Sequence, residues 1–399
     1  MRVLSPSDLR AEHGGQSVLV GGRVIAAADE ACQLADAFTK LTVTFAARVA
    51  VDPGDLLVVA GEYQNGSLVR STLAERSAHP TPRGDGDIGR FMLEGVGRRL
   101  SARADARVAA RAYFSAEQFL EVETPLRVPA PGVDLHLDAI SADGGHLITS
   151  PELHMKRLLV AGLPRIFQFA RASRAEEFGQ LHEPEFTMLE WYRAFAGLPE
   201  ILADTEQLVA TVARSVAGRA TLTLPDGRVL DATPPFARVT VREAFVEHAG
   251  IHDAVDLALG DEARYFELLV GRVEPGLARE SRPLFLWQYP RNQASLARLS
   301  DSDPSVAERF ELYAGGVELC NGFAELTDPI EQRRRFEHER ALREQRGRPS
   351  YPLDERFLTA LQAGMPRAVG NALGFDRLLM LALGCSSIAD VIAFPAQRL

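Results

Sequence analysis

Short apolar stretches that alternate with polar positions recur through the first 79 residues. They cover residues 16–27, 33–46, 55–63 and 66–77. The turn sequences Asp-Pro-Gly and Gln-Asn-Gly lie around the third of them. Short strands at this spacing predict a small β-barrel. The segment carries 7 basic and 9 acidic residues, which favours a structural or protein-docking role over nucleic-acid binding, the alternative.

A different pattern follows the stretch 80–90, which is rich in proline and glycine and which we interpret as a linker. Apolar residues recur at helical spacing, with arginines beside them. The apolar positions are Val96, Leu100, Ala104, Val108 and Ala112, and the arginines are Arg99, Arg103, Arg107 and Arg111. We expect an amphipathic helix whose basic edge faces solvent. Residues 119–128 then alternate like a strand that stops at Pro125.

Strands and helices do not alternate regularly in the rest of the chain. Strand patterns cover 163–170, 186–195, 283–289, 309–316 and 317–326, and helical ones cover 197–218 and 328–346. A hairpin is predicted over 221–232, a helix beginning with the capping box of Thr240 and Glu243, and a strand-to-helix passage over 371–384. This order predicts an α+β fold, an antiparallel sheet flanked by helices. The expected domains are 1–79, the linker 80–90, and 91–399.

Composition restricts the class of protein. The chain has 399 residues, of which 46% are hydrophobic, enough for a large core. No apolar run approaches the roughly 18 to 20 residues of a membrane span, and the first residues lack the core of a signal peptide, so we expect a cytoplasmic protein with no membrane contact. Three distant cysteines favour neither disulfides nor a cysteine metal site. A net charge of -10 argues against a broad nucleic-acid surface.

The candidate chemistry lies in three separated segments. No P-loop, dinucleotide fingerprint or His-Glu-x-x-His helix occurs in the sequence. Residues 119–131, 173–195 and 369–380, in that order, resemble motifs 1, 2 and 3 of class II aminoacyl-tRNA synthetases. The resemblance extends over about residues 91–399 and is closest to the lysine branch of the class. It implies the class II catalytic core, with the amino-terminal segment as a small OB-like barrel.

The resemblance also implies a reaction and its residues. A carboxylate attacks the α-phosphorus of ATP and pyrophosphate leaves, so arginines and Mg²⁺ stabilise charge on phosphate oxygens. Arg174 and Arg377 are the implied catalytic residues. The implied ATP-binding residues are Arg174, Glu176, His182, Phe186, Glu311, Glu318 and Arg377. Of these, Glu311 and Glu318, seven residues apart, match the pair that holds Mg²⁺.

The same resemblance implies a substrate pocket for a lysine-type amino acid. Glu152 and Glu325 match carboxylates that receive the side-chain ammonium, with Tyr192 as a hydrogen-bond partner. Glu190 and Asn321 match residues near the backbone amino and carboxylate groups. Ala372 stands where lysyl-tRNA synthetases typically have glycine, which implies a preference for (R)-β-lysine. Buried acids favour a substrate with two cationic groups over a neutral isostere.

Within the lysine branch, the segments SPELHMKRLL, HEPEFTMLEWYR and ADVIAFP resemble the family of ligases that attach (R)-β-lysine to elongation factor P. The implied acceptor is that factor, with no role for tRNA, and the implied assembly is a homodimer through residues 91–125. Ser173, Ala175 and Glu183 depart from the family pattern, as does the amino-terminal extension. The alternatives are a lysyl-tRNA synthetase, a free-standing lysine-activating paralogue, and a non-catalytic regulatory binder.

Overall fold

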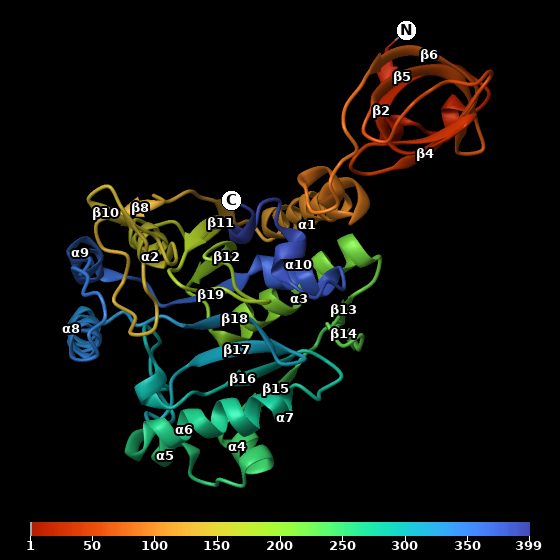
Figure 1. The fold of residues 1–399 in the computed structure, drawn as a ribbon. Helices are drawn as coiled ribbons and strands as arrows, with labels where there is room; N and C mark the ends of the chain where they lie inside the picture. The colour runs from red at the N-terminus through yellow and green to blue at the C-terminus, as the bar shows by residue number, and fades with distance from the viewer. Residues whose placement is uncertain (1) are drawn as a thin grey trace. The chain divides into compact units, whose positions relative to one another are not determined.

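The computed structural model describes residues 2–399, which separate into two compact units. The first covers Met1–Ala102 and the second Arg103–Leu399, so the division falls inside helix α1 (Val96–Ala116) (Figure 1). Among the described residues, no helix is long and apolar enough to cross a membrane. All three cysteines are buried thiols, as their spacing predicted.

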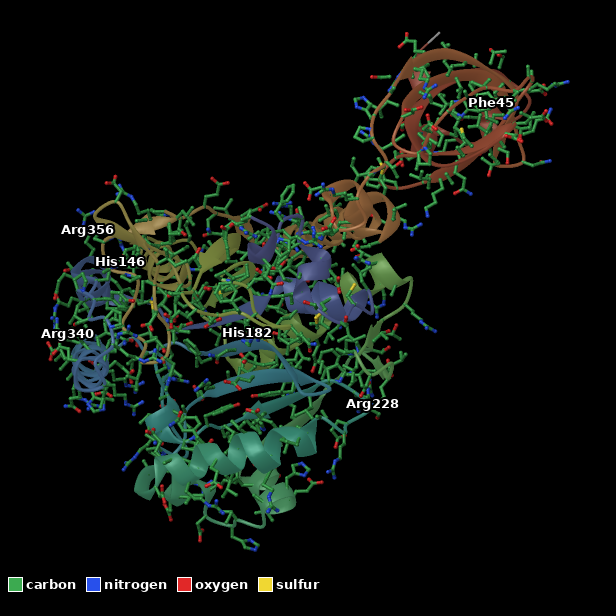
Figure 2. All side chains as sticks on the ribbon, viewed as in Figure 1. Phe45, His146, His182, Arg228, Arg340 and Arg356 are labelled. Atoms are coloured by element: carbon green, nitrogen blue, oxygen red, sulfur yellow. The ribbon has the colours of Figure 1, made fainter. Side chains whose placement is uncertain are left out.

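The first unit is a closed barrel. Its strands are β1 (Val3–Leu4), β2 (Ser17–Ala28), β3 (Ala31–Ala35), β4 (Lys40–Phe45), β5 (Leu56–Gln64) and β6 (Ser67–Ser77). They follow the order β1-β2-β3-β4-β6-β5, and β2 also pairs with β5, which closes the sheet. Burial alternates along β4, so that Leu41, Val43 and Phe45 (labelled in Figure 2) fill the interior. The prediction of a small OB-like barrel is confirmed.

The stretch 33–46, predicted as one strand pattern, divides into β3 and β4. The division occurs at Asp36, whose carboxylate accepts hydrogen bonds from the amides of Phe38 and Thr39, each at 2.8 Å. A carboxylate that binds the amides two and three residues ahead fixes a turn. Past the barrel, the turn η3 (Gly89–Leu93) precedes α1.

An eight-stranded sheet forms the centre of the second unit. Its strands are β7 (Leu120–Glu121), β11 (Arg165–Ser173), β12 (Glu185–Ala194), β15 (Ala237–Thr240), β16 (Leu284–Trp287), β17 (Arg309–Ala314), β18 (Val317–Ala324) and β19 (Ala368–Gly374). The order is β15-β16-β17-β18-β19-β12-β11-β7. The five inner pairings are antiparallel, and only the two edge pairings, β15 with β16 and β7 with β11, are parallel. The predicted antiparallel sheet is confirmed.

Helices flank this sheet. They are α2 (Glu152–Val160), α3 (Leu198–Ala217), α4 (Val241–Ala249), α5 (Ala254–Gly260), α6 (Glu262–Leu268), α7 (Glu274–Leu277), α8 (Pro329–Gln345), α9 (Glu355–Gly364) and α10 (Phe375–Ala382). α3 and α10 pack on one face of the central strands, and α4 to α7 gather at the β15 and β16 end (Figure 1). The capping box that begins α4 is confirmed, since Thr240 accepts from the amide of Glu243 at 3.1 Å.

Shorter elements complete the described chain. They are β8 (Arg127–Val128), β9 (Ser141–Ala142), β10 (Gly145–Leu147), the predicted hairpin β13 (Thr221–Thr223) and β14 (Val229–Asp231), and the turns η1 (Pro6–Asp8), η2 (Ala11–His13), η4 (Leu269–Val273), η5 (Arg291–Gln293), η6 (Ile388–Val391) and η7 (Ala396–Arg398). The strand predicted over 119–128 is wrong in its extent. Only Leu120–Glu121 pairs with β11 and, past Pro125, Arg127–Val128 joins another sheet. Proline has no amide hydrogen to donate.

The solvent-facing arginine edge expected on α1 is also wrong. Arg103 forms an ion pair with Asp376, the residue before Arg377, and donates to Thr187 Oγ1 at 2.7 Å. Arg107 lies over the ring of Phe169 at 4.8 Å. Periodicity could not reveal this, because Arg103 and Asp376 are 273 residues apart in sequence. Arg103 and Arg107 therefore pack against β11, β12 and α10.

Candidate active site

Four of the candidate residues form one row across the sheet. Strand pairing aligns Glu311 with Asn321, Asn321 with Ala372, and Ala372 with Glu190. Side chains of paired residues lie about 5 Å apart on the same face. That face is opposite to the helix-covered one, because Trp191, beside Glu190, packs in the core with α3 and α10. The row therefore brings residues from four strands into one groove floor.

An acidic cluster occupies one end of this floor. Glu190 and Glu325 are 0% and 2% exposed, and Glu152 begins α2 beside them. Ser150 Oγ donates to Glu190 Oε1 at 2.6 Å, and the hydroxyl of Tyr192 donates to Glu190 Oε2 at 2.9 Å. The four residues that sequence reasoning assigned to the ammonium ends of a substrate are thus together. We call Glu152, Glu190 and Glu325 the acid cluster.

The acid cluster contains a cation that sequence reasoning missed. Lys156, one turn after Glu152 on α2, is 1% exposed. Its Nζ lies 2.5 Å from Glu152 Oε1 and 2.5 Å from Glu325 Oε2. The four-residue spacing of Glu152 and Lys156 on one helix was the available sequence signal, since such residues share a helix face.

Burial raises the pKa values of two of these carboxyl groups. Burial first, and then the Glu152 carboxylate, raise the pKa of Glu190 to about 7, against the hydrogen bonds from Ser150 and Tyr192. Burial likewise raises the pKa of Glu325 to about 8, although the Lys156 ammonium opposes it. Without a cation beside them, buried carboxylates are costly to ionise. The cluster, which has one cation for three carboxyl groups, therefore favours binding of further positive charge.

Glycine at 370 keeps the cluster compact. A Cβ at Gly370 would lie 2.3 Å from the Tyr192 ring and 2.6 Å from Glu325 Oε1. Oε1 of Glu325 has no hydrogen-bond partner among the residues that the structure describes. A buried acceptor without a partner is a position at which a donor would bind favourably.

A second group of candidate residues surrounds the loop between β11 and β12. The guanidinium of Arg377 donates to the Leu181 carbonyl at 3.1 Å and to the Glu318 carbonyl at 2.9 Å, and lies 2.7 Å from His182 Nε2. His182 is labelled in Figure 2. Burial, and then the Arg377 charge, lower the pKa of His182. A lowered pKa favours the neutral imidazole, so the positive charge beside the loop is carried by arginine and not by His182.

Arg174 completes this group, and Glu176 does not join it. The Arg174 guanidinium lies over the Phe186 ring at 5.1 Å, and its Nε is buried without a partner in the described chain. A donor left without a partner favours an added acceptor, such as a phosphate or carboxylate oxygen.

Glu176 is exposed and has a left-handed backbone with φ 62°. Its side chain makes no hydrogen bond to a described residue.

The candidate metal pair flanks a β-bulge. Register between β17 and β18 shifts at Leu312 and Tyr313, so Glu318 lies opposite Tyr313 while Glu311 lies opposite Asn321. Glu311 accepts from the Tyr289 hydroxyl at 2.5 Å and the Tyr313 hydroxyl at 2.7 Å. Burial, and then the Glu311 carboxylate, raise the pKa of Glu318 to about 7. Two neighbouring carboxylates are hard oxygen donors and fit an ion such as Mg²⁺ that keeps several waters.

Arg309 connects the two ends of the groove and was also missed. Its Nη2 donates to Glu311 Oε1 at 2.6 Å, and its Nε donates to Asn321 Oδ1 at 3.1 Å. The guanidinium also lies over the Tyr289 ring at 4.5 Å. No sequence pattern marked it, since its role follows from the alternation that puts Arg309 and Glu311 on the same face of β17.

The three departures from the family pattern have structural partners. The Ser173 amide donates to the Ile148 carbonyl, and the Ala175 amide to the Asp138 carbonyl, each at 2.8 Å. Glu183 is 4% exposed, and its Oε2 accepts from the amide of Ala396 at 2.9 Å. The acid at 183 therefore ties the loop between β11 and β12 to the last residues of the chain.

Comparison with known proteins agrees with this geometry. The sequence model described as tRNA synthetases class II (D, K and N) matches residues 90–398. A relative from Proteus mirabilis (strain HI4320), the elongation factor P (R)-β-lysine ligase, is 45% identical over 303 residues. That alignment covers 72% of this chain and 92% of the relative. Residues 1–89 lie outside the family match.

Proposed function

The chain belongs to the class II tRNA synthetase family of the D, K and N type, and from this premise we propose that it activates a lysine-type amino acid with ATP and transfers it to elongation factor P. The preferred substrate is (R)-β-lysine and the acceptor is a lysine side chain of that factor. The name of the 45% identical relative supports (R)-β-lysine as the substrate and elongation factor P as the acceptor protein. We propose the cytoplasm as its location.

The buried acid cluster carries this proposal. When its three carboxyl groups are ionised, the cluster faces one protein ammonium, which leaves a formal charge of -2 (three negative charges against one positive charge) at the floor of the groove. A lysine-type amino acid has two ammonium groups, which would balance that charge. A neutral side chain would leave a buried carboxylate without a partner.

The first step forms the aminoacyl-adenylate. An oxygen of the amino-acid carboxylate attacks the α-phosphorus of ATP, and the bond to the bridging oxygen of pyrophosphate breaks. Arg174 is available to bind the substrate carboxylate and α-phosphate, because its Nε has no hydrogen-bond partner in the described part of the chain. Arg377 would bind the terminal phosphate, and Glu311 and Glu318 would hold Mg²⁺, which supplies charge neutralisation when bound.

The second step moves the acyl group to the acceptor. The acceptor amine attacks the carbonyl carbon, AMP leaves with the bonding electrons, and the amine loses a proton. The product is an amide on the acceptor lysine. No nucleophile of the protein is needed in either step, which agrees with a groove floor built from carboxylates, arginines and hydroxyls.

A homodimer is part of the proposal, through residues 91–125. Within the second unit, Val108 on α1 is 66% exposed and Leu120 on the edge strand β7 is 52% exposed. Apolar side chains and an unpaired strand edge favour coverage by another surface. Light scattering at micromolar concentration should give twice the chain mass, and a monomer would contradict this part.

One experiment tests the function. The enzyme is incubated with ATP, Mg²⁺ and one of (R)-β-lysine, α-lysine or norleucine, and ATP–pyrophosphate exchange is followed. Exchange should occur with the two lysines and be at least about 100-fold weaker with norleucine, the neutral isostere. Labelled amino acid should then pass to elongation factor P and not to tRNA. Efficient charging of tRNA would identify a tRNA synthetase instead.

A further inference from the structure

Lysine is rare in this chain, and one of its two copies lies in the acid cluster. Of the 44 basic residues, 42 are arginine, and the lysines are Lys40 and Lys156. Arginine is used even where a cation is fully buried, as at Arg343, which is 0% exposed. Burial alone therefore does not explain lysine at 156. The position needs an ammonium group.

The geometry at Lys156 explains the need. Its Nζ lies 2.5 Å from a carboxylate oxygen of both Glu152 and Glu325, and 5.0 Å from the centre of the Phe323 ring. A compact ammonium fits between two carboxylates at that distance, whereas a planar guanidinium is wider and directs its donors in a fixed fork.

Lys156 also determines how much charge the substrate must bring. Without it, three carboxylates would share the floor of the groove, and the substrate would be attracted by a formal charge of -3. With it, the formal charge of the ionised cluster is -2, and Glu325 Oε1 has no hydrogen-bond partner among the residues that the structure describes. We propose that Lys156 is a resident cation of the amino-acid pocket, a positioning residue that fixes Glu152 and Glu325 and leaves places for two substrate ammonium groups.

The substrate part of this inference rests on the proposed function, but the resident cation can be tested without it. Lys156→Ala removes a three-carbon chain with its ammonium, the shape of propylammonium. Millimolar propylammonium should therefore raise the thermal midpoint of Lys156→Ala by more than that of the wild type, in which the Lys156 ammonium already occupies this position. 1-Propanol has the same length and no charge, and it should have no effect on either protein. Lys40→Ala, at an exposed lysine of the barrel, is the matched control and should behave like the wild type.

Activity provides the second measurement. Lys156→Ala should lower the efficiency of lysine-dependent exchange by about 100-fold or more, as expected when a buried charge loses its partner. Propylammonium should restore at least about 10-fold of it, while methylammonium, which lacks the chain, restores less. Lys156→Arg keeps the charge and the fold, and it should also lose activity because the wider head group displaces the carboxylates.

The outcomes separate the two proposals. Wild-type exchange that is absent with every lysine-type amino acid would overturn the proposed function and leave the stability test in place. A thermal midpoint of Lys156→Ala that does not respond to propylammonium would overturn the resident cation. An exchange efficiency of Lys156→Arg equal to that of the wild type would also overturn the proposal that Lys156 is a resident cation. Lys156→Arg is the deciding variant if Lys156→Ala does not fold.

Discussion

Single carboxylates control both recognition and stability in the groove. Glu325 is 2% exposed, contacts Lys156, and keeps Oε1 free of hydrogen bonds within the described chain. Its amide analogue has nearly the same shape and no charge. Substitution at this residue therefore isolates the contribution of the charge.

The first prediction concerns Glu325→Gln. The variant should fold and lose lysine-dependent exchange by about 100-fold or more, because a buried ammonium that loses its carboxylate partner is destabilised by about 3 to 5 kcal/mol. Steady-state exchange kinetics, with circular dichroism for the fold, measure this. Glu337→Gln, on the exposed surface of α8, is the control. Near-normal lysine affinity in Glu325→Gln would mean that the ammonium binds elsewhere.

The second prediction concerns pH. The pKa values of Glu190 and Glu325 are raised to about 7 and about 8, above the ordinary value of a glutamate in the unfolded chain. The folded state therefore binds more protons, and the free energy of unfolding of the unliganded protein falls as pH rises from about 4.5 to about 8. Over the upper part of that range the KM for lysine should also fall, since ionised carboxylates bind ammonium groups.

Thermal midpoints between pH 5.5 and pH 8.5, with and without lysine, check the pH prediction. Glu190→Gln should flatten the dependence near pH 7, because it removes one of the three buried carboxyl groups that titrate in this range, the others being Glu318 and Glu325. A thermal midpoint that rises with pH through this range would contradict the assignment of these carboxyl groups as the cause. The same holds if the slope of the midpoint against pH is equal in Glu190→Gln and the wild type.

The third prediction concerns Ala372, which strand pairing puts between Asn321 and Glu190. Its methyl group lies beside the position expected for the backbone amino group of the substrate. Ala372→Gly should shift preference from (R)-β-lysine toward α-lysine by about 10-fold, within the range of about 10- to 200-fold that one methyl group can give. The ratio of exchange efficiencies for the two isomers measures it. An unchanged ratio would remove Ala372 from the specificity argument.

At the scale of elements, the groove depends on strand register. The row of Glu311, Asn321, Ala372 and Glu190 crosses four strands, and a one-residue slip of any strand would turn its member into the helix-packed core. The bulge at Leu312 and Tyr313 lets Glu318 occupy the same groove.

The fourth prediction concerns Arg309, which links β17 to β18. It bonds Glu311 of the candidate metal pair and Asn321 of the candidate substrate pocket. Arg309→Lys keeps the charge but cannot bond both, so the KM values for MgATP and for lysine should each rise by about 10-fold, as for the loss of one hydrogen bond to a charged group. In this variant, binding of MgATP should no longer raise the affinity for lysine, and binding of lysine should no longer raise the affinity for MgATP. Calorimetric titrations with either ligand added first measure this.

Arg228→Lys, in an ion pair with Asp226 at the hairpin of β13 and β14, is the control for Arg309. It should leave both KM values within about twofold, as a partly exposed pair contributes little. If Arg309→Lys changes only one of the two constants, Arg309 supports that subsite alone and does not link them.

Elements whose pattern is local could be predicted from the sequence, whereas long-range contacts could not. Alternation predicted the barrel strands, and the capping box predicted the start of α4, because both depend on neighbouring residues. The acid cluster followed from motif resemblance, and the structure brings its members together. The contacts of Lys156, Arg309 and the packed arginines of α1 were not predicted, since each depends on a partner from another element.

At the scale of the whole molecule, the candidate site lies entirely in the second unit. Every candidate residue falls between Glu152 and Arg377, inside Arg103–Leu399 and inside the family match over 90–398. The barrel has its own core, which includes Val20, Leu34 and Val59 at 0% exposure. The barrel therefore contributes no candidate residue to the activation step.

The fifth prediction follows from this division. A chain that begins at residue 88 keeps the whole of α1 and the family segment, and it should retain lysine-dependent exchange within about threefold, since no candidate site residue is removed. Transfer to elongation factor P should be measured in parallel. Loss of exchange in a truncated protein that is folded by circular dichroism would show that the barrel supports the groove.

The scarcity of lysine has a further consequence for an enzyme that makes an activated acyl group. An aminoacyl-adenylate that dissociates from the groove acylates exposed primary amines, and those of the enzyme itself are the nearest. This chain carries its surface positive charge on arginine, which does not form such amides at neutral pH because its guanidinium stays protonated. Lys156 is buried against two carboxylates, so Lys40 is the one exposed lysine side chain that self-acylation could reach.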